Sequence, residues 1–162
     1  MSESVSSWLA GRLPEDWFEG APEVTVDRDE ILVVGSVAAP EGADADSESG
    51  RIARFREDTR ERRMAIAREA EHRFGRKVAW GAVCGSTREL FTTLSVPVMT
   101  RLRQPERQVL DTLVDAGVAR SRSHALAWCV RLVGQHSDEW LSSLRAAMEE
   151  VARVREQGPG AA

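Results

Sequence analysis

Apolar positions in the last third of the chain recur with the period of amphipathic α-helices. Four of them share one face of a helix expected over residues 105–116: Val109, Leu110, Leu113 and Val114. Five others share one face of a second helix, which follows a serine cap at residues 121–123: Ala125, Leu126, Cys129, Val130 and Val133. Gly117 ends the first helix, so the two helices meet at a tight turn. This arrangement is typical of several helix-turn-helix classes and also of a plain helical hairpin.

Strand-forming residues dominate four runs in the first hundred residues. Residues 24–26 and 31–37 predict a hairpin around a polar turn, and residues 77–83 and 90–98 predict two more strands around a turn at 84–89. Between these pairs, helical spacing of apolar residues predicts one long amphipathic helix from Arg51 to about Phe74, ended by Gly75. The order strand, strand, helix, strand, strand predicts an α+β unit.

The remaining segments complete the predicted organisation. Residues 1–22 form an aromatic, acidic segment, which we expect to dock on another part of the protein rather than to remain a solvated tail. Within that unit, residues 38–50 are acidic, rich in small residues and without periodicity, which predicts a disordered loop. A C-terminal amphipathic helix is expected over residues 137–157, with a tail at 158–162. Its apolar residues follow a heptad seam that packs either on the chain's own core or on a second copy: Trp140, Leu144, Ala147, Val151 and Val154.

The net charge of −4 is distributed unevenly along the chain. Residues 1–50 carry a net charge of −10, whereas residues 51–77 carry +5 and residues 99–135 carry +3. Basic regions of this kind attract phosphate locally despite the negative total. The arginines of residues 51–76 are interspersed with acids that can pair with them along the helix, so a solvated face and a phosphate surface are both compatible with the pattern.

No motif indicates catalysis or a cofactor. His72, His124 and His136 are not linked by any known pattern to a nucleophile, and the glycines form neither a dinucleotide-binding fingerprint nor a P-loop. Cys84 and Cys129 have no partners at metal-ligand spacing, and we interpret both as small packing residues. We therefore expect a protein that is not an enzyme and that holds neither a metal nor another cofactor.

No membrane partner is expected either. No run approaches the roughly 18 uninterrupted apolar residues of a membrane helix. The start of the sequence, Met-Ser-Glu-Ser-Val, lacks the regions of a signal peptide. These features predict a cytoplasmic protein.

The amino-acid sequence of the helix pair resembles that of a known family. Residues 110–126 read Leu-Asp-Thr-Leu-Val-Asp-Ala-Gly-Val-Ala-Arg-Ser-Arg-Ser-His-Ala-Leu, and this resembles the ribbon-helix-helix DNA-binding family, with the likeness confined to about residues 93–135. The resemblance implies an obligate homodimer in which each subunit contributes one strand to an antiparallel ribbon that enters the major groove. It also implies a phosphate contact at the start of the second helix, which helix geometry favours independently. The predicted fold class is thus α+β, with an N-terminal unit, a ribbon-helix-helix-like module over residues 91–136 and a C-terminal helix.

The register of the ribbon leaves two alternatives open. An ungapped alignment places the strand near residues 96–102 with Met99 and Arg101 facing outward, whereas the stronger β run 90–98 places Thr93 and Ser95 outward. We expect one of these sets to face the DNA, but not both. Pro97 removes a backbone donor from either strand.

These patterns together define the candidate site residues. The candidate DNA-binding residues are Thr93, Ser95, Arg101, Arg103, Arg120, Ser121, Arg122 and Ser123. The candidate dimer-core residues are Leu94, Val96, Val98, Leu110, Leu113, Leu126 and Val130.

The leading hypothesis is a homodimeric regulator of transcription that binds double-stranded DNA. The alternative is an adaptor that keeps the helix pair as a dimerisation core and binds a protein partner through residues 1–90. A weaker alternative is binding of RNA or single strands through the arginine-rich helix 51–76, which requires exposed stacking aromatics.

Overall fold

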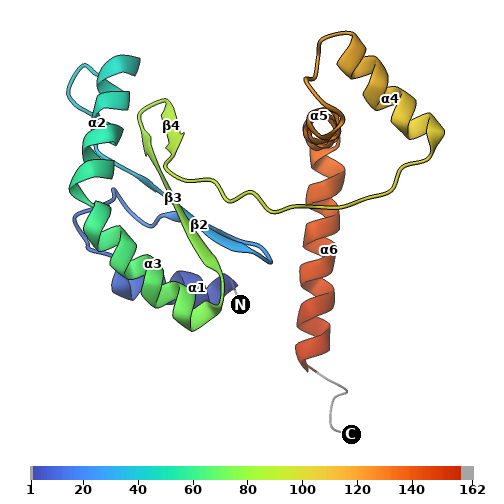
Figure 1. Ribbon diagram of the computed structural model, residues 1–162. Coiled ribbons are helices and arrows are strands. Elements are labelled where there is room, and N and C mark those ends of the chain that lie inside the picture. Colours follow the sequence, from blue (N-terminus) through green and yellow to red (C-terminus); the bar gives the residue numbers. More distant parts are fainter. Residues whose placement is uncertain (1, 158–162) are drawn as a thin grey trace, which may run out of the picture. The chain divides into compact units, whose positions relative to one another are not determined.

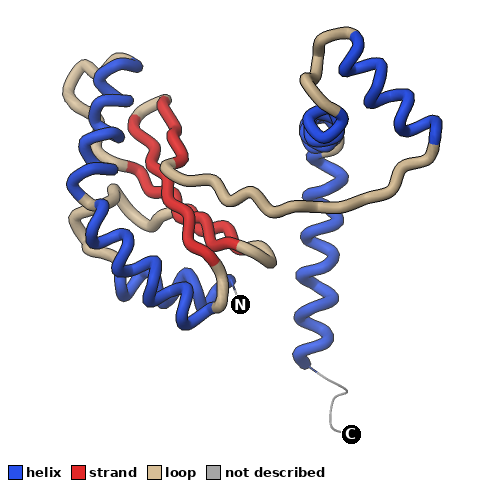
Figure 2. The backbone as a smooth tube through the Cα atoms, in the orientation of Figure 1, coloured by secondary structure: helices blue, strands red, loops and turns tan. Residues whose placement is uncertain are grey.

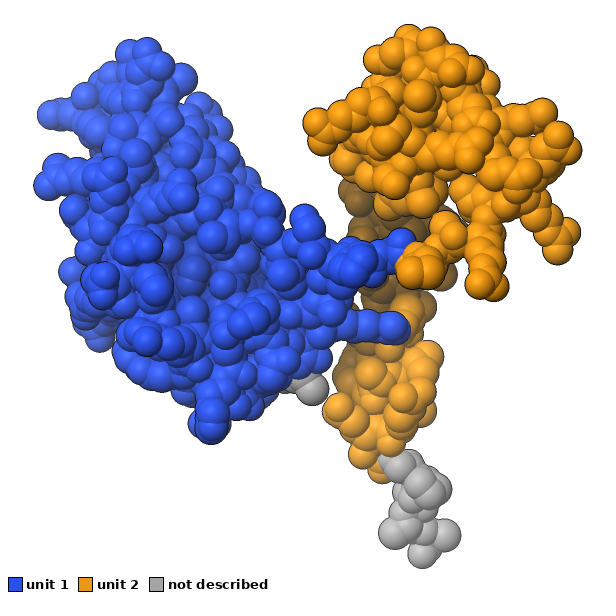
Figure 3. Space-filling view, in the orientation of Figure 1, with its two compact units in different colours: residues 1–98 blue, residues 99–162 orange. Residues whose placement is uncertain are grey.

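The computed structural model describes residues 2–157, and the predicted tail at 158–162 lies outside the described residues. These residues form an α+β chain with a four-stranded sheet and six helices (Figure 1). The chain divides into two compact units, residues 1–98 and 99–162 (Figure 3). The sequence had placed this boundary near residue 90.

The sheet of the first unit has the order β1-β2-β3-β4. Strands β1 (Glu23–Val26) and β2 (Glu30–Ser36) form the predicted hairpin, and its turn is held by the Asp27 carboxylate, which accepts hydrogen bonds from the N–H groups of Asp29 and Glu30. Strand β3 (Lys77–Cys84) runs parallel to β2, so the connection between them must cross over, and helices supply it. Strand β4 (Thr87–Leu90) returns antiparallel to β3 through a two-residue turn.

Three helices lie along the same face of this sheet (Figure 1). Helix α1 (Ser2–Arg12) belongs to the acidic N-terminal segment, and Val5 and Leu9 bury it against the sheet, so the prediction that this segment docks is confirmed. Helices α2 (Ala45–Asp58) and α3 (Arg60–Phe74) form the crossover. The hydrophobic core between sheet and helices contains Ile31, Val33, Trp80, Ala82 and Cys84 from the strands and Trp17, Ile52, Phe55, Ile66 and Phe91 from elsewhere.

Two predictions about this crossover were wrong. The expected disordered loop 38–50 contains the first turns of α2, because Asp44 and Ser47 form a reciprocal capping box that starts the helix at Ala45. The single long helix over residues 51–74 is two helices separated at Thr59. The Thr59 side chain donates to the Phe55 carbonyl in the last turn of α2 and accepts from Arg63 Nε in the first turn of α3, so it links the two helices across the break.

The second unit contains three helices: α4 (Gln104–Asp115), α5 (Arg122–His136) and α6 (Asp138–Gln157). Helices α4 and α6 agree with the predicted helices to within one residue at each end, and α5 begins within the predicted serine cap at 121–123. Pro105 lies in the first turn of α4, where its missing N–H costs no helical hydrogen bond. The predicted strand over residues 90–98 was wrong, because β4 ends at Leu90. Residues 91–103, all of them described, form the long loop between β4 and α4 in Figure 2.

Candidate nucleic-acid interface

The corner between α4 and α5 is held by backbone hydrogen bonds. Gly117 has a φ of +74°, a conformation that glycine adopts without steric cost. Beyond it, the N–H groups of Val118 and Ala119 both donate to the Leu113 carbonyl at 3.0 Å. Ala119 is thereby drawn into the interior of the helix pair, where it is buried. The corner therefore has a defined geometry from which α5 begins.

The core beneath this corner is small. Only Leu110, Ala119 and Ala125 are buried within the described part of the second unit. The residues packed around them are partly exposed: Leu102, Leu113, Val114, Leu126 and Cys129. A unit with so little buried apolar surface has limited stability by itself, since burial of apolar area is the main stabilising term in folding.

The start of α5 is capped by Ser121. Its hydroxyl oxygen accepts a hydrogen bond from the N–H of His124 at 3.2 Å, as the predicted serine cap requires. The His124 ring in turn accepts from the N–H of Arg120 through Nδ1 at 3.3 Å. Ser123 is exposed beside them in the first turn of the helix. The first N–H groups of a helix have no partner inside it, so this end of α5 has the polarity that favours an anion.

Arg122, which the sequence placed among the phosphate contacts, pairs with Asp111 of α4. Nε lies 2.6 Å from Oδ1 and Nη2 lies 2.8 Å from Oδ2, so the guanidinium forms a two-pronged ion pair. The hydrogen bonds from Arg122 hold the pKa of Asp111 below its ordinary value, and those same bonds raise the pKa of Arg122. No local sequence signal pairs Asp111 with Arg122, although the two residues lie on predicted helices joined by a short turn.

The four remaining candidate DNA contacts lie before or at the start of α4. Thr93, Ser95 and Arg101 are exposed on the loop that links the units, and Arg103 is the exposed N-cap residue of α4. The predicted β run has no strand partner here because the last bond to the sheet is that of the Phe91 N–H to the Trp80 carbonyl, at 2.7 Å. Thr93 and Ser95 thus belong to the first unit, and Arg101 and Arg103 belong to the second unit, just before α4.

The candidate dimer-core residues divide into two groups. Leu110 is buried, and Leu113 and Leu126 are half-buried around it. The other four are exposed: Leu94 by 40%, Val96 by 47%, Val98 by 88% and Val130 by 65%. The heptad seam of α6 is exposed as well, at Trp140, Leu144, Val151 and Val154. Ala147 is also exposed, so none of the five predicted seam residues is buried in the chain's own core.

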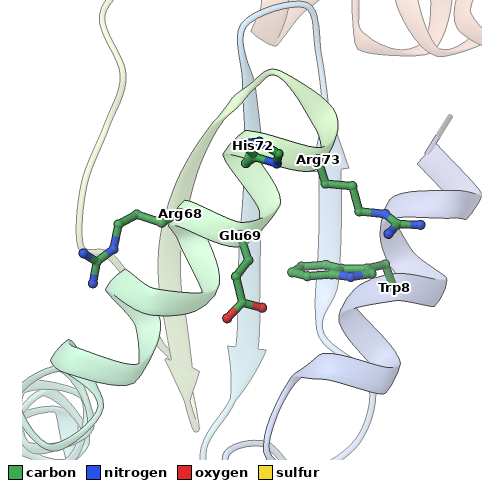
Figure 4. A pocket seen from close by; sticks show the side chains of 5 residues that line it. All are labelled: Trp8, Arg68, Glu69, His72 and Arg73. Carbon is green, nitrogen blue, oxygen red and sulfur yellow. The ribbon is translucent and has the colours of Figure 1, made fainter.

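The arginine-rich segment 51–76 has an aromatic neighbour that the sequence did not predict. Trp8 of α1 lies beside Arg68, Glu69, His72 and Arg73 of α3 and lines with them a broad surface cavity of about 770 Å³ (Figure 4). In this view Arg68 points away from the indole ring. Glu69 already accepts two hydrogen bonds from Arg12, at 2.6 and 2.7 Å. The cavity is thus lined by one acid, Glu69, which is already paired with Arg12, and by two exposed arginines, Arg68 and Arg73.

Both cysteines are packing residues, as predicted. Cys84 is buried in the core of the first unit, and burial raises the pKa of its thiol above the ordinary value. Cys129 packs against the small core of the second unit. Among residues 2–157 there is no group of three or more His, Cys, Asp or Glu side chains that could hold a metal ion. None of the described helices is long and apolar enough to cross a membrane.

Fold and site together define a two-part protein, in which an α+β unit precedes a capped helix pair and a long terminal helix. Family comparisons divide the chain in the same way. A family described as the N-terminal domain of Rv1265-like proteins matches residues 3–90, and one described as the Mb1296 C-terminal domain matches residues 103–155. The chain belongs to the Rv1265-like family. The interval between the two matches, residues 91–102, falls within the loop that carries Thr93, Ser95 and Arg101.

Relatives from two mycobacterial species are similar over nearly the whole chain. Mb1296 of Mycobacterium bovis and Rv1265 of Mycobacterium tuberculosis are each 60% identical to it over 161 residues, which cover 98% of this chain and 71% of the relative. Both are named as uncharacterized proteins. No solved structure matches the chain.

Proposed function

We propose that this chain is a homodimeric DNA-binding regulator of transcription of the ribbon-helix-helix type. One observation carries the proposal: an exposed segment of alternating apolar and polar residues leads directly into a helix pair whose second helix begins with Ser121-Arg122-Ser123. The helix pair supplies the scaffold, and a ribbon would form only when two copies meet.

The pattern of residues 93–101 supports pairing with a second copy. Alternate side chains of an extended chain face opposite sides, so Leu94, Val96 and Val98 share one face, and Thr93, Ser95 and Arg101 share the other. In an antiparallel ribbon the apolar face would cover the small core formed by Leu110, Leu113 and Leu126, together with Val130 of α5. Backbone N–H and C=O groups that have no strand partner in one chain would pair across the two copies.

The polar face of such a ribbon would contact bases. The register decides whether Thr93 and Ser95 or Met99 and Arg101 lie at its centre, and one set is expected there rather than both. Arginine on guanine discriminates by about 1–3 kcal/mol per two-pronged contact, which makes Arg101 the stronger candidate for base recognition. Arg103, Arg120 and Ser123 would bind phosphate, with Ser121 holding the start of α5 and Arg122 held against Asp111.

The test is DNA binding by the purified 162-residue chain, measured by fluorescence anisotropy with fragments of its own genome at several salt concentrations. We expect an affinity that falls as salt rises, because bound phosphates release counterions. Arg101→Ala should weaken binding to the preferred fragment by about 10-fold or more. Arg131→Ala, which removes the same charge from an exposed position within α5, should leave fragment preference unchanged. Absence of any salt-sensitive affinity would contradict the proposal.

A second function is favoured by the Asp111–Arg122 ion pair. Since Arg122 is already engaged within the chain, the helix pair can serve as a dimerisation core without contacting DNA. The protein would then be an adaptor that binds a protein partner through the first unit. A stable dimer without DNA affinity would favour this function over the first.

A further inference from the structure

A second cavity of the first unit lies beside the junction of α2 and α3, away from the helix pair in sequence. Its volume is about 480 Å³, within the range of roughly 300–1,000 Å³ that is usual for small-molecule sites. Three arginines line it: Arg56 at the end of α2, and Arg60 and Arg63 in the first turns of α3. Phe91 and Thr92 line it from the segment that follows β4.

Arg63 is the distinctive residue of this cavity. Its side chain is only 7% exposed, which is unusual for arginine unless a partner neutralises the charge. Nε donates to Thr59 Oγ1 at 2.9 Å and one terminal nitrogen donates to the Arg56 carbonyl at 2.6 Å, while the guanidinium carbon lies 4.8 Å from the centre of the Phe91 ring. These partners are neutral. A guanidinium has five N–H donors, so the two hydrogen bonds leave three N–H groups for a ligand.

The surrounding charge is positive. Burial, and then the nearby charges of Arg56 and Arg60, lower the pKa of Arg63 to about 10. Within residues 2–157, none of these three arginines forms an ion pair. Glu57 and Glu89 also line the cavity, but the Glu89 carboxylate already accepts a hydrogen bond from Ser49 Oγ at 2.5 Å. Three guanidinium groups against two carboxylates leave an excess of one positive charge.

We propose that this cavity binds the phosphate group of a small organic phosphate, with Arg56, Arg60 and Arg63 as its ligands. Guanidinium groups match phosphate geometry with paired hydrogen bonds, and a dianion would compensate the repulsion among the three arginines. The cavity is larger than a phosphate group, and Ala53 and Met64 offer apolar surface for the rest of the ligand. The proposal is independent of the proposed DNA binding, because it concerns the first unit alone.

Isothermal titration of the 162-residue chain, without DNA, tests this site. The probes are ribose 5-phosphate, adenosine monophosphate and inorganic phosphate, with ribose, adenosine and succinate as matched compounds that lack phosphate. We expect both organic phosphates to bind more tightly than inorganic phosphate, and the three compounds without phosphate to bind at least 10-fold more weakly than the organic phosphates.

Two variants test whether the ligand binds in this cavity. Arg60→Gln removes one exposed ligand without touching buried Arg63, and it should weaken ribose 5-phosphate binding by about 10-fold or more, as loss of a charge-assisted hydrogen bond implies. Arg54→Gln removes the same charge from an exposed position of α2 outside the cavity and should change the affinity less than twofold. Equal binding of adenosine and its monophosphate, no effect of Arg60→Gln, or binding of a single-stranded oligonucleotide but of neither organic phosphate would each overturn the proposal.

Discussion

Arg122 and Asp111 join the first turn of α5 to the middle of α4 through two parallel hydrogen bonds, of 2.6 and 2.8 Å. This geometry fixes the guanidinium in one orientation at the corner where the proposed phosphate contact lies. The side chains are 60% and 43% exposed, so water and salt screen the pair and its contribution to stability is small. Under the proposed function, the pair determines whether Arg122 is available to DNA.

Removing the acid should therefore release the arginine. We expect Asp111→Asn to raise the affinity for DNA fragments at low salt, because Arg122 becomes free to contact phosphate, with only a small change in melting temperature. Asp115→Asn removes the same charge from an exposed position one turn later in α4 and is the control. Equal gains for both variants in an anisotropy titration would show a general charge effect, and would contradict a specific role for the ion pair.

The two serines that flank Arg122 should behave differently. Ser121→Ala removes the cap of α5 and should lower the free energy of unfolding of the second unit by about 1 kcal/mol. Ser123→Ala removes an exposed hydroxyl without a cap role and should change stability by less than about 0.5 kcal/mol. Under the proposed function it should nevertheless weaken DNA binding. Chemical denaturation and anisotropy of the same samples separate the two effects.

Local signals explain why the second unit was predictable. Pro105, Gly117 and Ser121 each act within a few residues, so the positions of α4 and α5 follow from sequence. The proposed ribbon is different, since it would require a partner chain. Neither candidate strand forms in the single chain, and the choice between Thr93 with Ser95 and Met99 with Arg101 stays a prediction.

In the first unit, the errors arose where the hydrogen bonds or burial of single residues override the average composition of a segment. Residues 38–50 have the composition of a disordered loop, yet Asp44 and Ser47 cap a helix within them. Thr59 divides an otherwise continuous helical pattern, because the break allows both α2 and α3 to pack on the same sheet. Arg63 looked like any other arginine of a charged helix, and nothing in the local spacing marked it as the one that is buried.

The turn between β3 and β4 should be sensitive to acid. Glu48 Oε2 accepts four hydrogen bonds, from the N–H and hydroxyl groups of Ser86 and Thr87, at 2.7 to 3.1 Å. These bonds, the Thr87 hydroxyl first, lower the pKa of Glu48 from its ordinary value near 4.5. Because folding lowers the pKa of Glu48, the ionised carboxylate stabilises the folded unit above pH 4.5. This stabilisation is lost as the pH falls through the pKa of Glu48 in the folded protein.

Glu48→Gln should therefore lower the melting temperature of the first unit by several degrees at pH 7 and by much less near pH 3. Glu41→Gln, at an exposed position before α2, is the control and should change it little at either pH. Thermal unfolding followed by circular dichroism at the two pH values provides the measurement. A loss that does not depend on pH would contradict the assigned role of the carboxylate.

Gly85 faces the same carboxylate and should not tolerate a side chain. Its φ is +56°, and a Cβ atom there would lie 2.0 Å from Glu48 Oε1. We expect Gly85→Ala to destabilise the first unit by about 1–3 kcal/mol through backbone strain and displacement of Glu48. Gly50→Ala is the control, because Gly50 lies within α2 with open space around it. This substitution should raise the free energy of unfolding by about 0.5–1 kcal/mol. Urea denaturation of both variants measures the difference.

The proposed dimer has two candidate interfaces, both of them exposed apolar surfaces. Val96 is 47% exposed on the loop before α4, and Val154 is 58% exposed on the seam of α6. If the ribbon forms the interface, Val96→Asp places a charge at its centre and should raise the dimer dissociation constant by 10-fold or more, since an unpaired charge is costly to bury. Val154→Asp should leave it nearly unchanged. Light scattering coupled to size exclusion measures both, with circular dichroism to check folding. If Val154→Asp produces a monomer and Val96→Asp does not, the interface lies on α6, and this result would contradict the proposed ribbon.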